Sequence, residues 1–217
     1  MAQMIYPVVE PGDTEKETGR LEAFSDGVLA IAITLLALNL TVPSPSNSPD
    51  FSLWQELLKR WPTYLAFLVS FLFVLVIWIN HHRLFLTIRR SDSILLLLNG
   101  LLLMSVTIIP FSTQLVASYL QTPDARVAGI VYNGLFFMIS IFFNAIYHYA
   151  AYNNRLFDKK TDPKLAAAIG RRYLVGPIAY AVAVLIAQVS VSASLLLNLL
   201  LAVFFAIPYQ ASRSERQ

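Results

Sequence analysis

Residues 93–121 read SILLLLNGLLLMSVTIIPFSTQLVASYLQ and contain no Asp, Glu, Lys or Arg. About 20 consecutive apolar residues are enough for a helix to cross the hydrocarbon core of a bilayer. The whole chain has the same character, since 57% of its 217 residues are hydrophobic and only 13% are charged. A soluble domain usually carries about 25% charged residues. The sequence therefore predicts an integral membrane protein with an all-α fold.

Six apolar segments are expected to cross the membrane as helices. The prolines of residues 43–46 end the first segment, and Pro110 is expected to kink or end the third. The last apolar region, residues 173–209, is too long for one crossing and must fold back near residues 188–194. The expected spans are residues 21–42, 62–81, 93–119, 127–149, 173–189 and 192–209, within a membrane domain of residues 20–211 between tails 1–19 and 212–217.

Residues 51–60 alternate apolar and polar side chains between the first two spans. This pattern predicts a short amphipathic helix at the membrane interface. Trp54 and Trp61 suit the headgroup region, where tryptophan is enriched.

The positions of Lys and Arg predict the orientation in the membrane. With six spans, 13 of the 16 basic residues fall on one side, and only Lys59, Arg60 and Arg126 fall on the other. Loops rich in Lys and Arg stay in the cytosol. The first twenty residues are polar and acid-rich and lack the apolar core of a secretory signal. We therefore expect a multi-pass protein of the cell (inner) membrane with both termini in the cytosol.

Charged and polar residues gather at the start of the first span, as Arg20, Glu22, Ser25 and Asp26 show. A charge inside a bilayer is costly and marks a candidate functional site. The alternative is an ordinary helix start, where Asp is favoured by the helix dipole. If the segment is buried, Ser25 and Asp26 need partners of similar depth.

Three residues of other spans lie at that depth on the cytosolic side. They are Trp78 and His81 at the end of the second span and Asn99 near the start of the third. A hydrogen-bonded cluster with Arg20, Ser25 and Asp26 is therefore possible, although His81 can equally be solvated at the interface. The chain has three His and no Cys, and no metal-binding spacing, so no metal site is expected.

Beyond Asp26, one stripe of the first span holds Ile31, Thr34, Leu35 and Leu38. Periodicity alone does not decide its role, because any apolar helix offers such a stripe for packing against lipid or another helix.

The string Arg20-x-x-x-Phe24-Ser25-Asp26 resembles the RxxxFSD signature of the transmembrane protein 175 family of potassium channels. Residues 28–34 that flank it are also similar to bacterial members of that family, and the resemblance extends over about residues 20–211. It implies a homotetramer of six-span subunits around a central pore lined by the first helix.

The resemblance also implies roles for individual residues. Ile31, Leu35 and Leu38 would form an apolar pore constriction that takes part in selecting potassium, with Thr34 as a neighbouring polar layer. Arg20, Phe24, Ser25, Asp26, Trp78, His81 and Asn99 would form a structural network near the inner mouth. The chain has no TVGYG sequence, so an apolar hydrophobic gate would replace the usual filter of backbone carbonyls.

Two other classes of protein stay open at this point. A secondary transporter of a cation or small solute is the alternative, although such transporters usually show inverted repeats and broken midplane helices. A membrane enzyme lacks a visible nucleophile or cofactor motif. The expected partners are therefore the bilayer and monovalent cations such as potassium, without a cofactor and without nucleic acid, since the net charge is only +3.

Overall fold

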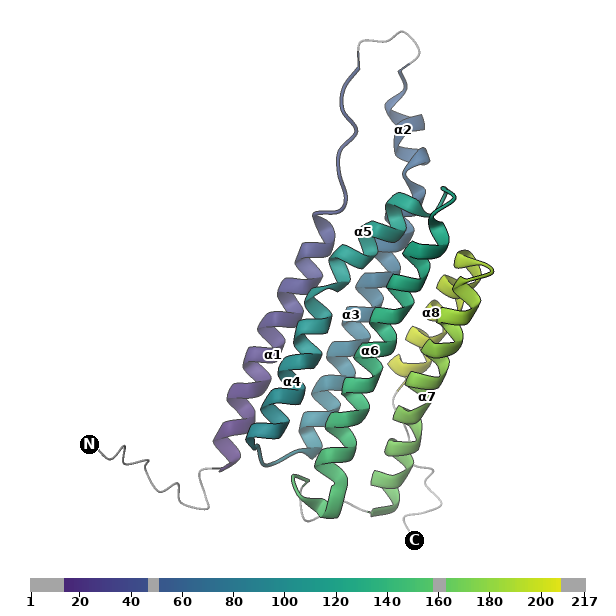
Figure 1. Ribbon diagram of the computed structural model, residues 1–217. Helices are drawn as coiled ribbons and strands as arrows, with labels where there is room; N and C mark the ends of the chain where they lie inside the picture. Colours follow the sequence, from purple (N-terminus) through teal and green to yellow (C-terminus); the bar gives the residue numbers. More distant parts are fainter. Residues whose placement is uncertain (1–13, 47–50, 158–162, 208–217) are drawn as a thin grey trace, which may run out of the picture.

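The computed structural model describes residues 14–46, 51–157 and 163–207, and this part of the chain is a bundle of α-helices (Figure 1). No β-strand occurs in these residues, so the all-α prediction is confirmed. In chain order the helices are α1 (Thr14–Ala37), α2 (Leu53–Lys59), α3 (Trp61–Thr87), α4 (Ser93–Thr107), α5 (Ile109–Tyr119), α6 (Ala125–Ala151), the 3₁₀ turn η1 (Tyr152–Asn154), α7 (Pro163–Ala187) and α8 (Val191–Ala206).

Four helical segments in the described residues are long and apolar enough to cross a membrane: α3, α4 together with α5, α6, and most of α7. The two remaining long helices differ from them. The last 18 residues of α1 contain Arg20, Glu22 and Asp26, and α8 has only 16 residues. Multi-pass character is thus supported by four segments, and the count of six stays a prediction.

The first helix ends at Ala37, five residues earlier than expected from residues 21–42. After Ala37 the chain makes two tight turns, because the amides of Leu38 and Asn39 donate to carbonyls three residues back. The Asn39 side chain then donates to the carbonyl of Pro110 at 3.0 Å, which fixes the end of α1 against α5. At its other end α1 begins at Thr14, so the helix includes part of the expected tail of residues 1–19.

The expected third span is divided into α4 and α5 at Ile108. Pro110 occupies the first turn of α5, where its missing N–H leaves no intrahelical bond unmade. The predicted effect of Pro110 is therefore confirmed as a break between two helices.

The short helix predicted within residues 51–60 is present as α2. None of its residues is buried in the single chain. Figure 1 shows α2 above the bundle and roughly in line with α3, which begins directly after Arg60. The helix thus extends α3 outward instead of lying across the end of the bundle.

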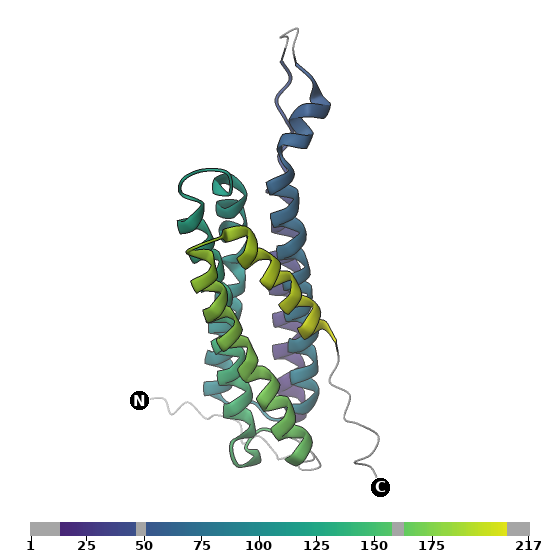
Figure 2. The same cartoon turned by 90° about the vertical axis from the view of Figure 1, so that its right-hand side faces the viewer.

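A tight turn joins α7 to α8, as the polar residues in this region predicted. The hydroxyl of Ser190 accepts a hydrogen bond from the amide of Ala193 and caps α8. Figure 2 shows α8 running diagonally back across the bundle. The boundaries of these two helices differ from the predicted spans of residues 173–189 and 192–209. The helix α7 begins at Pro163, ten residues earlier than predicted, and α8 ends at Ala206. Residues 208–209 and the expected tail of residues 212–217 lie outside the described residues.

Asp92 joins two loops at the end of the bundle where α3 and α6 end. Its carboxylate caps α4 by accepting from the Leu95 amide at 2.9 Å, and it also accepts from the Tyr149 hydroxyl at 2.6 Å. Arg155, in the segment after α6, forms an ion pair with the same carboxylate at 3.2 Å. Partial burial raises the pKa of Asp92, but these hydrogen bonds and the Arg155 charge outweigh burial and lower it below the ordinary value of 3.8.

We predict that Gly129→Ala lowers stability. A Cβ on Gly129 of α6 would lie 2.9 Å from Cγ2 of Val191, at the start of α8, and the overpacking would cost about 1–3 kcal/mol. Gly134→Ala is the control on the same helix, because a Cβ there meets no atom within 4 Å. Thermal unfolding in detergent measures both variants, and equal unfolding temperatures would contradict this packing.

We also predict that Asp92→Asn lowers the unfolding temperature at pH 7 and that the difference from the unchanged chain closes in acid. The folded-state pKa of Asp92 is below its ordinary value, so its stabilisation is present above pH 3.8 and is lost as the pH falls through the folded-state pKa. Glu56→Gln is the control, since the pair of Glu56 with Lys59 is exposed. A difference that stays constant from pH 7 to pH 3 would contradict the prediction.

Candidate functional site

A chain of buried hydrogen bonds joins α1, α4 and α3. The Asn99 side chain donates to the hydroxyl of Ser25 at 2.9 Å, and its carbonyl oxygen lies 2.9 Å from Nε2 of His81. All three side chains are at most 1% exposed. The sequence-based cluster is thus present for these three residues, and interfacial solvation of His81 is excluded by its burial.

The direction of each hydrogen bond in the Ser25–Asn99–His81 cluster is fixed. The Ser25 hydroxyl donates to the carbonyl of Leu21 at 2.8 Å, so its lone pair accepts from the Asn99 amide group. The oxygen of Asn99 is then the acceptor toward His81, and Nε2 of His81 must carry the hydrogen. The His81 ring also stacks on Phe85, with centroids 4.5 Å apart. The ring is therefore held in one orientation from two sides.

A direct hydrogen bond between α1 and α3 lies beside the Ser25–Asn99–His81 cluster. The indole N–H of Trp78 donates to the carboxylate of Asp26 at 2.9 Å. Trp78 and His81 are three residues apart on α3, and Ser25 and Asp26 are adjacent on α1. Two neighbouring contacts fix both the depth and the rotation of α1 against α3.

The opposite face of α1 is exposed in the single chain. Ile31 and Leu35 on this face are 58% and 39% exposed, whereas Leu29 and Leu36 on the packed face are at most 1% exposed. Leu38 was expected on the same helical stripe, but it lies in the turn directly after α1, because the helix ends at Ala37, and it is 73% exposed. Thr34 is also exposed, and its hydroxyl donates to the carbonyl of Ile31 within the helix. Intrachain packing therefore leaves this apolar stripe uncovered.

Two residues of the expected network lie outside the cluster. Phe24 is 63% exposed, and Arg20 is exposed as well. Both lie at the cytosolic end of α1 by the predicted orientation, and the hydrogen bonds of the cluster are made by Ser25 and Asp26 instead.

Two further buried polar clusters were not anticipated from the sequence. On α3, α5 and α6, the hydroxyls of Thr113 and Tyr132 both contact the hydroxyl of Ser70, at 2.7 and 3.0 Å. On α6 and α8, the Asn198 side chain donates to that of Asn133 at 2.8 Å. Asparagines within apolar runs are the signal that could have indicated the second cluster.

Comparison with known proteins places this geometry in a family. Residues 20–110 match the model of the family described as the endosomal/lysosomal potassium channel TMEM175. A potassium channel from Chamaesiphon minutus is 48% identical over 193 residues, which cover 89% of this chain and 95% of the relative. A potassium channel from Streptomyces collinus is 40% identical over 190 residues, which cover 87% and 91% of the two chains.

The fold agrees with these similarities. The crystal structure of a lysosomal potassium-selective channel TMEM175 homolog from Chamaesiphon minutus matches with a TM-score of 0.80 at 46% identity. The match covers 88% of this chain and 97% of the homolog. With the contacts that Ser25 and Asp26 of the RxxxFSD string make to α4 and α3, these matches over nearly the full length show that this chain belongs to the TMEM175 family, a family of ion channels and not of enzymes.

Proposed function

We propose that this chain forms a potassium-selective or potassium-preferring channel in which α1 lines the pore. Two relatives that share most of their length with it are named potassium channels, and the matching crystal structure is of a potassium-selective homolog. The observation that carries the pore assignment is the uncovered face of α1 with Ile31 and Leu35, continued by Leu38 in the turn after the helix.

A homotetramer of six-span subunits would place this face at a central axis. The hydrogen bonds of Ser25 and Asp26 hold α1 against α3 and α4, so the stripe cannot turn inward without breaking them. The six spans would be α1, α3, α4 with α5, α6, α7 and α8. The excess of Lys and Arg puts both termini in the cytosol, and the proposed location is the cell membrane.

The proposed constriction would act by excluding water. Rings of Ile31, Leu35 and Leu38 side chains from four subunits offer no polar group to a passing ion, and such a ring can gate by dewetting. Potassium sheds its water more readily than sodium, so a narrow dry passage disfavours sodium more. Thr34 would add a polar layer beside the rings, and Asp26 near the inner mouth would attract cations.

A secondary transporter of a cation or small solute is the alternative function. It would need a broken helix that forms a midplane binding site. The break between α4 and α5 at Ile108 and the proline inside α7, Pro177, are features in the described residues that favour it. However, Ser105 and Ile108 already pair their backbone groups across this break, so fewer polar groups are left for a solute. Passive flux at channel rates separates the two functions.

We predict that Ile31→Asn raises ion flux and lowers the preference for potassium, because an amide ring would keep the constriction wet. Purified protein in liposomes is tested with a potassium gradient and then with a sodium gradient. Ile178→Asn is the matched control, since Ile178 on α7 is 68% exposed in the single chain and lies outside the proposed pore. If Ile31→Asn and Ile178→Asn behaved alike, the pore assignment would be wrong.

We further predict that Trp78→Phe destabilises the protein by about 0.5–1.5 kcal/mol through loss of an exposed hydrogen bond to Asp26, and also alters flux. Phenylalanine keeps an aromatic ring on α3 but leaves Asp26 without the indole donor. Trp54→Phe on α2 is the control, because Trp54 is 69% exposed. Unfolding temperature and flux are measured for both variants. Identical results for the two would show that the Trp78–Asp26 bond does not hold α1.

A further inference from the structure

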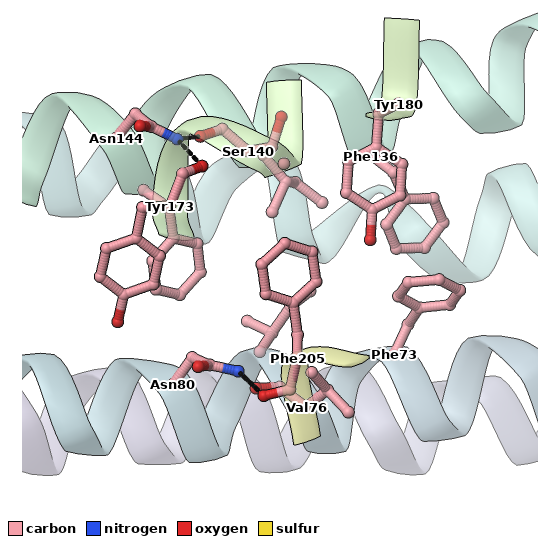
Figure 3. Close-up of a pocket in the computed structure, with 13 residues that line it drawn as sticks. Phe73, Val76, Asn80, Phe136, Ser140, Asn144, Tyr173, Tyr180 and Phe205 are labelled. Atoms are coloured by element: carbon pink, nitrogen blue, oxygen red, sulfur yellow. Dashed lines mark hydrogen bonds between the residues drawn. The ribbon is translucent and has the colours of Figure 1, made fainter. Parts of the chain in front are cut away.

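A cavity of about 60 Å³, partly open to the outside of the single chain, lies between α3, α6, α7 and α8 (Figure 3). Its walls are mainly apolar and include the aromatic side chains of Phe73, Phe136, Tyr180 and Phe205. The ring centroids of Phe73 and Phe136 are 4.4 Å apart, and the ring of Tyr180 stacks on that of Phe136 with centroids 5.9 Å apart. The cavity is distinct from the proposed pore, because the cavity-lining residues of α3 are not those that bind α1.

One buried acceptor in the cavity wall has no partner. Asn144 is only 8% exposed, and its side-chain oxygen makes no hydrogen bond within the described residues. Its amide nitrogen donates to the carbonyls of Ser140 at 2.9 Å and Tyr173 at 2.8 Å (Figure 3). Turning the amide over would set its oxygen against two carbonyls, so this orientation is fixed. A buried acceptor left unpaired costs free energy, and a bound donor would relieve that cost.

The size and the lining of the cavity limit the occupant. A water molecule needs only about 10–15 Å³ on the same measure, and benzene fits an engineered cavity of about 150 Å³. The cavity is therefore larger than one water and smaller than a benzene site. Water also needs about two to four polar partners, and the surface of this wall is mainly apolar. A molecule with one hydroxyl and a short hydrocarbon part fits both features. Its hydroxyl can donate to the side-chain oxygen of Asn144, and its hydrocarbon part can pack against the apolar wall.

We propose that this cavity is a binding site for a small aliphatic alcohol of about two to four carbon atoms. The hydroxyl donates to the side-chain oxygen of Asn144, and the hydrocarbon part packs against Phe73, Phe136 and Phe205. No ion and no neighbouring subunit is required for this site, so it is independent of the proposed channel function.

The test is crystallographic, with 2-bromoethanol as the probe. The chain contains no cysteine that the probe could alkylate. Crystals soaked over a concentration series should show a saturable anomalous bromine peak against the aromatic wall, with the hydroxyl within hydrogen-bond distance of Asn144. Ordered water alone in the cavity at the highest concentration would overturn the proposal.

Variants that fill the cavity locate the site. Val76→Phe on α3 should remove the peak, because Val76 lines the cavity and a phenyl ring would occupy its volume. Val127→Phe, at a position 59% exposed on α6, is the matched control and should keep the peak. Ile139→Phe is a second filling variant in case Val76→Phe does not fold. A peak that persists in a folded filling variant would place the probe elsewhere and overturn the proposal.

A matched pair of probes tests the hydrogen bond. Bromoethane has the same bromine and carbon atoms without the hydroxyl, so it should bind the unchanged chain about threefold to tenfold more weakly than 2-bromoethanol. In Asn144→Leu this difference should disappear. Equal binding of the two probes to the unchanged chain would show that the cavity takes any small apolar molecule and would overturn the assignment of an alcohol.

Discussion

The hydrogen bond between Asn99 and Ser25 is the contact on which the placement of α1 depends. A membrane provides no water to pair a buried polar group, so each such group must find its partner inside the protein. Asn99 does this twice, toward Ser25 on α1 and toward His81 on α3. A rotation of α1 would break the bond from Asn99 to Ser25 and leave a buried amide donor of Asn99 unpaired, and the exposed stripe follows from that constraint.

Within about one and a half helical turns, two faces of α3 make different contacts. Trp78 and His81 bind α1 and α4, while Val76, Ile77 and Asn80 line the aromatic cavity. A change in the packing of the cavity would therefore act on the same segment that positions α1.

The short length of α8 is compensated by side chains of other helices. Its 16 residues extend about 24 Å, less than the roughly 30 Å of a hydrocarbon core. The last carbonyls of α8 accept hydrogen bonds from Asn80 and Arg83 of α3 and from Arg172 of α7. These donors satisfy groups that a helix end would otherwise leave unpaired. Arg83 and Arg172, which the sequence offered only as indicators of orientation, thus also have a structural role.

The sequence alone determined the helical membrane fold, the break at Pro110 and the turn at Ser190, because apolar length, proline and polar turn residues act locally. It also identified Ser25 and Asn99 as partners, since depth in a membrane can be counted along a helix. Tertiary structure decided which side of α1 is packed, that Phe24 lies outside the cluster, and that Asn144 has a free acceptor. These properties depend on the rotation of each helix against its neighbours, which is set by contacts between residues far apart in the chain and is not encoded in the period of any single helix.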